Sequence, residues 1–360
     1  ALWLPDPDQL AAADERLKRP SVQLSLIMIT EYALAQLWQS WGVTPAALIG
    51  HSMGENTAAC LAGVMSLEDC IGLVHLRGQL FDSVPKGGML SVPLSADALR
   101  PYLGDRLDIA SLNASDLTAA SGPDADLVDL EQRLNADGIE PQRIAIDIAA
   151  HSRMLEPILD RFGDYLRSIQ LSAPQIPILS NRTGDYLTAA EATDPAYWVA
   201  HLRHTVHFAD GLTRLAEKKE RVFLEVGPGK ALSSLAQAHG AISANQVIGT
   251  LRHPEDSIAD DEYFMAMLAR LWAAGVDIDW PQIWGEATRN RVPLPSYAFQ
   301  HKPYFIAPGA PRTAAEDEWP THRDDLAKWG YTPHWRPRLA EIEITSDTDL
   351  AQLPKETWLI

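Results

Sequence analysis

The chain has 360 residues, 46% of them hydrophobic and 22% charged, which is typical of a soluble protein with a large core. Its 48 acidic and 30 basic residues give a formal charge of −18, which argues against non-specific binding to nucleic acid. Cys60 and Cys70 are too few for a disulfide framework and lack metal-ligand spacing, and no apolar run has the length of a membrane span. We therefore expect a cytoplasmic protein with no metal site and no membrane span.

The first predicted element is a helix over residues 22–41, which are rich in helix formers, apolar on most faces and followed by Gly42. We expect this helix to be buried. The short apolar run of residues 46–49 comes next, followed by Ser52 between two glycines and then by a helical pattern of small residues. This order predicts a strand, a sharp turn and a second helix.

Residues 88–147 then change in character. Short apolar runs predict strands, and two amphipathic stretches predict helices, in the order strand, helix, strand, strand, helix, strand. This is the split βαβ pattern of a small ferredoxin-like subdomain, inserted into a larger unit. The strands are expected at 89–93, 107–113, 117–122 and 143–148, and the helices at 96–103 and 124–138.

After this insertion, strands and helices alternate again, which favours a mostly parallel sheet covered on both sides. The pattern predicts an amphipathic helix over 151–169, a strand and turn over 174–185, and a strand, turn and helix over 220–239. We therefore expect an α/β protein with a hydrolase-like, mostly parallel core. The predicted divisions are a large subdomain (1–87 and 148–290), a small subdomain (88–147), a linker (291–320) and the start of a further unit (321–360).

Ser52 lies in Gly50-His51-Ser52-Met53-Gly54, a G-x-S-x-G pattern between a predicted strand and a predicted helix. Such a turn needs glycine and often holds the nucleophile in strained backbone. At a helix start, the hydroxyl and a developing oxyanion meet free N–H groups. The alternative is a serine that only packs, but the strand-turn-helix context favours a nucleophile.

A serine nucleophile needs a base, and the chain offers 11 histidines. His151 stands out because it follows an apolar strand and precedes a helix, at the strand end where α/β active sites gather. Arg77 lies on an otherwise apolar helical pattern. There its guanidinium would either grip a carboxylate with two hydrogen bonds, or snorkel to solvent or pair with an acid, and the local pattern leaves both open.

Several motifs together resemble the malonyl-CoA:acyl carrier protein transacylase family, in particular the acyltransferase domains of type I polyketide synthases. They occur in the family's order from about residue 22 to residue 305, which makes the resemblance far more specific than one motif. The motifs are GHSMGE (50–55), LRGQLF (76–81), AAHSRMLEPIL (149–159), SNRTG (180–184), YWVAHLR (197–203), FLEVGPGKAL (223–232) and LPSYAFQHKPYF (294–305).

The resemblance implies that Ser52, activated by His151, forms an acyl-enzyme with the acyl group of an acyl-CoA and passes it to the phosphopantetheine thiol of an acyl carrier protein. Arg77 would hold the free carboxylate of malonyl-CoA or methylmalonyl-CoA, and the Met53 N–H would stabilise the oxyanion. The backbone near His201 would orient the histidine, with no catalytic aspartate. No cofactor is expected in the domain itself.

One departure concerns the start of the family, which has a strand and a Gly-Gln-Gly loop whose glutamine supplies a second oxyanion donor. Residues 1–20 contain nothing similar. The sequence is therefore expected to begin after this element, and losing such a donor typically costs about 10²–10³ in rate.

The other departure concerns the acyl pocket, which the resemblance places at His51, Met53, Arg77 and Ile148-Ala149-Ala150. Malonyl-selective members usually have phenylalanine at the position of Ala150, whereas methylmalonyl-selective members have a small residue there and tyrosine at the position of Ile148. Met53 is bulky where methylmalonyl enzymes often have glutamine. The indicators disagree, and we favour methylmalonyl or relaxed selectivity because a small residue at 150 leaves room beside the acyl group.

The C-terminal region resembles the linker that runs back toward a preceding ketosynthase, and residues 321–360 resemble the opening of a ketoreductase structural subdomain. Two alternatives remain. An α/β-hydrolase-type esterase or thioesterase shares the serine motif, but would have a catalytic acid between serine and histidine and no inserted subdomain. An inactive docking fragment of a megasynthase would need no intact Ser52, His151 and Arg77.

Overall fold

The computed structural model describes residues 6–287, 289–290 and 292–302. The chain divides into two units, residues 1–290 and residues 291–360. In the second unit, residues 292–302 form neither helix nor strand. The predicted ketoreductase start and most of the predicted linker lie outside the described residues.

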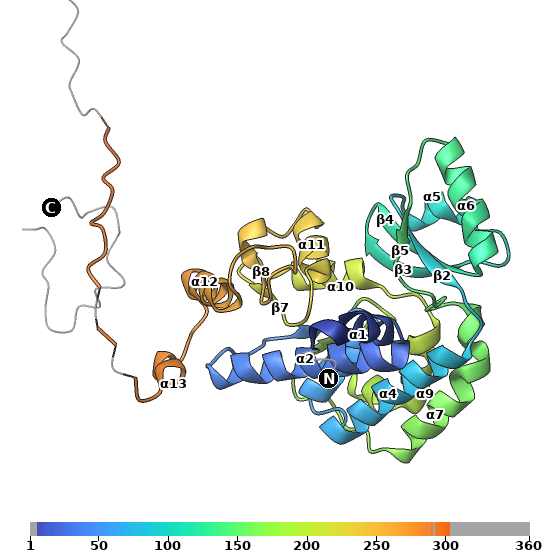
Figure 1. Cartoon of the computed structure of the whole chain (residues 1–360), viewed down its shortest axis with the longest axis horizontal. Helices are drawn as coiled ribbons and strands as arrows, with labels where there is room; N and C mark the ends of the chain where they lie inside the picture. Colours follow the sequence, from blue (N-terminus) through green and yellow to red (C-terminus); the bar gives the residue numbers. More distant parts are fainter. Residues whose placement is uncertain (1–5, 288, 291, 303–360) are drawn as a thin grey trace, which may run out of the picture. The chain divides into compact units, whose positions relative to one another are not determined.

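The first unit begins with helices whose ends follow from local residue types. α2 has Pro20 at its first position, where the missing N–H costs nothing, and Ser66 caps α4 by accepting from the Asp69 N–H. α2 and α4 pack against each other (Figure 1). After a 3₁₀ turn at Pro7–Gln9, the elements are α1 (Leu10–Leu17), α2 (Pro20–Ser40), β1 (Leu48–Ile49), α3 (Met53–Leu61) and α4 (Leu67–Ser83).

An antiparallel four-stranded sheet follows, in the order β3-β4-β2-β5. Helices α5 and α6 lie together on one side of it (Figure 1), over a core of leucines that includes Leu99, Leu127 and Leu130. The last strand is shorter than expected and ends at Ile144. The elements are β2 (Gly88–Val92), α5 (Ala96–Leu103), β3 (Asp108–Ala114), β4 (Leu117–Gly122), α6 (Asp124–Ala136) and β5 (Gln142–Ile144).

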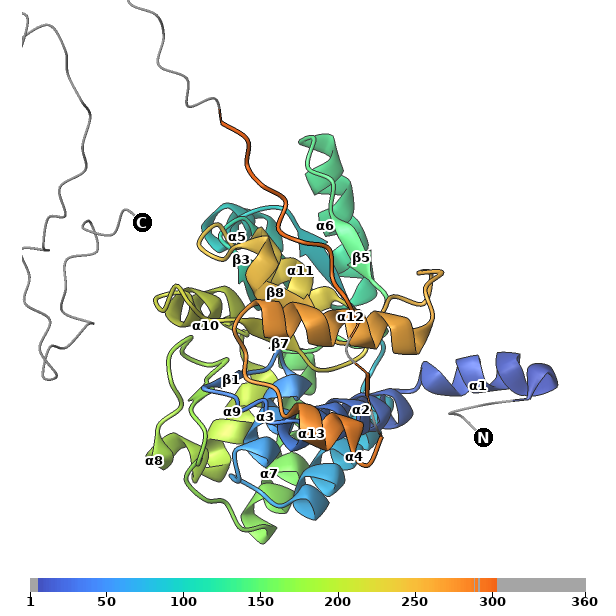
Figure 2. The same cartoon turned by 90° about the vertical axis from the view of Figure 1, so that its left-hand side faces the viewer.

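The remaining elements return to the larger part of the unit. The single helix expected over 151–169 is instead a 3₁₀ segment, Arg153–Ile158, followed by α7 (Leu159–Ser168), since Pro157 removes one backbone donor. Helices α4, α7 and α9 gather at one end of the unit (Figures 1 and 2). The later elements are β6 (Ile178–Leu179), α8 (Ala189–Ala192), α9 (Pro195–Arg203), α10 (Phe208–Leu215), β7 (Phe223–Glu225), α11 (Ala231–Ala238), a 3₁₀ turn (Ala244–Gln246), β8 (Val247–Gly249), α12 (Asp260–Ala273) and α13 (Trp280–Trp284).

The parallel strands form two pairs, whereas the sequence predicted one sheet. β1 pairs with β6, and β7 pairs with β8. β1 and β7 do not pair with each other, and both line a large cavity. Helix α2 is less buried than predicted: only Met28, Ala35 and Trp38 are buried, since much of its inner face lines that cavity. Within the described ranges, no helix is long and apolar enough to cross a membrane.

Candidate active site

Ser52 lies in the sharp turn between β1 and α3, in the positive-φ region that residues with side chains rarely adopt. Its φ is 54° and its ψ is −115°. Gly50 makes the turn possible, because a Cβ there would lie only 2.0 Å from the Gly54 carbonyl carbon. The predicted strand-turn-helix geometry is present, and it holds the hydroxyl at the first turn of α3.

The backbone amides of this turn have different partners. The N–H groups of Gly54 and Glu55 close the turn on preceding carbonyls, each at 3.0 Å. The Ser52 N–H donates to Asn181 Oδ1 at 2.8 Å. The Met53 N–H has no hydrogen-bond partner among the described residues and lies at the start of α3, so it is available to an oxyanion.

His151 is the histidine that reaches the serine. Its Nε2 lies 2.6 Å from Ser52 Oγ, and its side chain is 2% exposed. Its Nδ1 lies 2.9 Å from the His204 carbonyl oxygen, which can only accept, so Nδ1 carries the proton and Nε2 is free to accept one. Burial, assisted by the charge of Arg77, lowers the pKa of His151 to about 3, so the imidazole is neutral at physiological pH.

The backbone carbonyl that orients His151 lies in the predicted region. We expected this carbonyl near His201, and the hydrogen-bonding one belongs to His204, immediately after α9. The reason is geometric: α9 ends at Arg203, and the first carbonyl outside the helix turns toward the imidazole. The His201 backbone contributes a weaker effect that raises the pKa of His151.

Arg77 on α4 neither reaches solvent nor pairs with an acid. It is 2% exposed, and it forms no ion pair with any residue in the described part of the chain. Its Nη2 donates to Ser52 Oγ at 2.7 Å and its Nη1 to Asn56 Oδ1 at 3.1 Å, while Nε has no described partner. Burial lowers the pKa of Arg77 to about 10, so the guanidinium remains charged. A buried, unpaired cation beside a nucleophile favours an anionic substrate.

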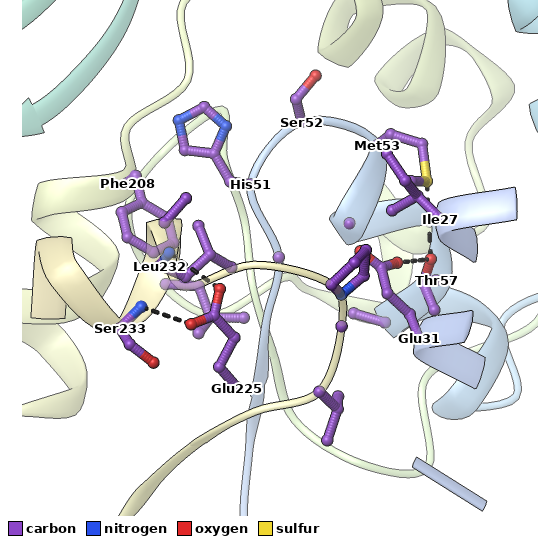
Figure 3. Close-up of a pocket in the computed structure, with 18 of the residues that line it drawn as sticks. Ile27, Glu31, His51, Ser52, Met53, Thr57, Phe208, Glu225, Leu232 and Ser233 are labelled. Carbon is purple, nitrogen blue, oxygen red and sulfur yellow. Dashed lines mark hydrogen bonds between the residues drawn. The ribbon is translucent and has the colours of Figure 1, made fainter. Parts of the chain in front are cut away.

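A cavity of about 1530 Å³ opens at these residues. His51, Ser52, Met53, Arg77 and His151 line it, and Figure 3 shows the first three of them together. The cavity then extends between β1 and β7.

The predicted acyl-pocket segment, Ile148-Ala149-Ala150, lines the cavity only in part. Ile148 and Ala150 line the cavity, whereas Ala149 does not and packs beside Gly87. His51 is held by Asn113, whose Oδ1 lies 2.9 Å from His51 Nε2, and burial lowers the pKa of His51. Asn113 carries no recognisable sequence signal, because no local pattern connects residue 113 with residue 51.

Two carboxylates face the far part of the cavity (Figure 3). Glu31 Oε2 accepts from the Thr57 hydroxyl at 2.6 Å, and burial, with Glu225 nearby, raises the pKa of Glu31 to about 7. Glu225 accepts from the N–H groups of Leu232 and Ser233 at the start of α11. Among the residues that the structure describes, no group of three or more side chains is arranged to hold a metal ion.

Comparison with known proteins gives matches over most of the chain. A sequence model described as "Acyl transferase domain" matches residues 10–277. The chain is 34% identical over 302 residues to part of the phenolphthiocerol/phthiocerol polyketide synthase of Mycobacterium tuberculosis, a match that covers 84% of this chain and 20% of that polypeptide. The chain therefore spans about a fifth of the length of this curated relative.

Solved structures show the same α/β fold. The acyl transferase domain of ZmaA is similar with a TM-score of 0.74 at 35% identity, covering 82% of this chain and 69% of that one. The acyl transferase domain of SpnD, in complex with 2-(pent-4-yn-1-yl)malonyl, has a TM-score of 0.67 at 40% identity, covering 71% and 62%.

Proposed function

Because the chain belongs to the acyl transferase domain family, which matches residues 10–277, we propose that it carries a malonyl-type extender unit from coenzyme A to an acyl carrier protein. It is an acyltransferase of the kind found in type I polyketide synthases. The observation that carries the substrate class is Arg77, a buried guanidinium without an acidic partner in the described residues, 2.7 Å from Ser52 Oγ. It would pair with the free carboxylate of malonyl-CoA or methylmalonyl-CoA.

The reaction has two halves that use the same groups. Ser52 Oγ attacks the thioester carbon while His151 Nε2 takes its proton, and the Met53 N–H binds the oxyanion. The tetrahedral intermediate collapses to the serine ester as the C–S bond breaks, and the imidazolium gives its proton to the departing thiolate of coenzyme A. The phosphopantetheine thiol then attacks the ester by the reverse sequence, releasing Ser52.

The hydrogen bond from His151 Nδ1 to the His204 carbonyl supports a dyad without an acid. No carboxylate among the described residues hydrogen-bonds to His151, whereas a hydrolase of the Ser-His-Asp kind places one there. This favours the transferase over the esterase or thioesterase. The hydrogen-bonded contact among intact Ser52, His151 and Arg77 likewise argues against an inactive docking fragment.

The acyl-enzyme itself is the sharpest test of the proposed function. After mixing with malonyl-CoA or methylmalonyl-CoA, intact-mass measurement should find an addition of about 86 or about 100 Da, as expected for the two serine esters. Ser52→Ala should carry neither adduct. The ester should persist in water and disappear on adding carrier protein. Absence of an adduct on the folded protein, or rapid release of free acid, would contradict the transferase.

Extender choice is tested at Ala150, which lines the cavity. Ala150→Phe should shift acylation from methylmalonyl toward malonyl, because the ring fills the space that an α-methyl group would use. The difference of one methyl in a pocket is worth about 1–3 kcal/mol, or about 10–200-fold in the ratio of kcat/KM values. Ala149→Val serves as the control, because Ala149 does not line the cavity. An unchanged ratio in Ala150→Phe would contradict the pocket argument.

For the fold we propose a hydrolase-like large subdomain, residues 1–87 and 148–290, and a ferredoxin-like small subdomain, residues 88–147. The strand order β3-β4-β2-β5, with all neighbours antiparallel, supports the latter. The cavity between β1 and β7 supports a further strand in the large subdomain, since an inner strand edge without a neighbour leaves backbone N–H and C=O groups without partners. The family's first strand, with its second oxyanion donor, would occupy this slot. A longer chain carrying that segment should form the acyl-enzyme faster.

The acceptor is the phosphopantetheine of an acyl carrier protein, and the domain itself binds no cofactor. A ketosynthase, and a ketoreductase after residue 320, would be neighbours in one cytoplasmic polypeptide. The free, buried thiols of Cys60 and Cys70 support a reducing compartment.

A further inference from the structure

The strand next to the nucleophile turn ends in a motif to which the proposed mechanism assigns no role. β6 runs parallel to β1, with Leu48 opposite Ile178 and Ile49 opposite Leu179. Continuing this register by two residues places Asn181 opposite His51, after both strands have ended. The two backbones no longer pair there, because the chain after β1 turns sharply into α3.

The Asn181 side chain continues the ladder where the backbone stops. Its Nδ2 donates to the Gly50 carbonyl at 2.7 Å, and its Oδ1 accepts from the Ser52 N–H at 2.8 Å. A residue in a parallel strand bonds in this way to the two residues that flank its opposite number. The amide orientation is unambiguous, because a carbonyl can only accept and an N–H can only donate.

Asn181 is itself held from both sides. Its N–H donates to Glu55 Oε2 at 2.7 Å, and its carbonyl accepts from the His207 N–H at 2.7 Å. Glu55 Oε1 in turn lies 2.5 Å from the Tyr197 hydroxyl. Asn181 is 2% exposed, and all of its polar groups have partners except for one amide hydrogen, so it has little capacity left for a substrate.

We propose that Asn181 is a positioning residue for the acyl transfer, which clamps both peptide groups around His51 and so holds Ser52 in its strained conformation. The inference rests on the proposed function for its reaction, but the clamp concerns the reactivity of Ser52 itself. Asn181 acts through Ser52, whereas Arg77 binds the carboxylate of the substrate. Loss of the clamp should therefore lower kcat and leave KM for malonyl-CoA nearly unchanged.

Asn181→Leu and Asn181→Asp test the clamp. Leucine has a similar shape and removes both hydrogen bonds, and we expect kcat to fall by about 10²-fold, the usual cost of misplacing a reacting group by about 1 Å. Aspartate keeps the acceptor for Ser52 N–H. When protonated, it can also donate to the Gly50 carbonyl, whereas its ionised form repels that oxygen. Activity of Asn181→Asp relative to wild type should therefore rise as the pH falls from about 8 to about 5.

The pH comparison needs a control, because other ionisable groups surround Asn181. They are His51 in the turn, Glu55 on α3, His201 on α9, Arg182 beside Asn181 in the chain, and His207 before α10. These are common to wild type and variant, so the ratio of the two rates removes the part of their titration that the substitution leaves unchanged. Asn135→Asp, on the exposed face of α6, adds the same charge elsewhere and should give a ratio that does not change with pH.

A fluorophosphonate that labels Ser52 separates this inference from the proposed function. Its phosphorus bonds to Ser52 Oγ as fluoride leaves and the proton goes to His151, so no acyl-CoA is needed. Slower labelling of Asn181→Leu, with pH-dependent recovery in Asn181→Asp, would support the clamp even if wild type rejects malonyl-CoA. Three results would each overturn the clamp. They are wild-type kcat in both variants, a rise in KM without a fall in kcat, and a loss of activity in Asn181→Asp that is equal at both ends of the pH range.

Discussion

Replacing Arg77 with leucine should lower kcat/KM for malonyl-CoA by about 10²–10³-fold, within the range of about 2–5 kcal/mol expected on truncating one member of a buried charge pair. The carboxylate of the substrate would then enter a buried site without a cation. Acetyl-CoA has no carboxylate, so its acylation of Ser52 should remain unchanged or increase. The two rates, measured with the same protein, give the selectivity directly.

Arg133→Leu is a suitable control, because Arg133 is exposed on α6 and pairs only with Asp129 among the described residues. It should leave both rates as they are. An equal loss for malonyl-CoA and acetyl-CoA in Arg77→Leu would mean that Arg77 supports the nucleophile through its contact with Ser52 Oγ and does not select the acyl group.

Replacing His151 with alanine should lower the rate of Ser52 acylation by about 10²–10⁴-fold, the usual contribution of a general base. The hydroxyl would keep its contact with Arg77 but lose the acceptor for its proton. Binding of malonyl-CoA should change little, because its carboxylate pairs with Arg77. Added imidazole should restore part of the rate, and acylation of His151→Ala at the wild-type rate would remove His151 from the mechanism.

The pH profile of the wild type carries a second signature of His151. Its pKa is lowered to about 3 by burial and by Arg77, so in the free protein the base is lost only as the pH falls toward that value. A bound carboxylate would neutralise Arg77 and so raise the pKa of His151. The acid limb of kcat, which reports the complex, should therefore lie at higher pH than the acid limb of kcat/KM.

Local sequence patterns were sufficient to predict the structure where a feature depends on residues that are neighbours in the chain. The turn at Ser52 requires Gly50, a short strand and a helix start, all within about fifteen residues, and the structure has this arrangement. The order of strands and helices over 88–147 was equally readable, because each amphipathic stretch carries its own periodicity. The helix expected over 151–169 was predicted less accurately, since Pro157 changes its first part to a 3₁₀ segment.

Local sequence patterns did not predict the contacts between residues that are distant in the chain. The sequence pointed to the neighbourhood of His201, yet the carbonyl that meets His151 is that of His204, because the end of α9 decides which carbonyl is free. Asn181 was visible only as part of a motif. Its role emerges from the register between β6 and β1, which joins residues 131 positions apart in the chain.

The sequence by itself determined the turn at Ser52 and the family, and predicted Ser52 as the nucleophile, because these depend on short-range residue spacing and on motif order. Only the tertiary structure decided that Arg77 is buried without an acidic partner among the described residues and that Asn181 spans the nucleophile turn. It also decided that Ala149 faces away from the cavity while Ala150 faces into it. The physical reason is that charge pairing, burial and hydrogen bonding depend on which surfaces meet in space, and chain-local periodicity carries no information about the partner.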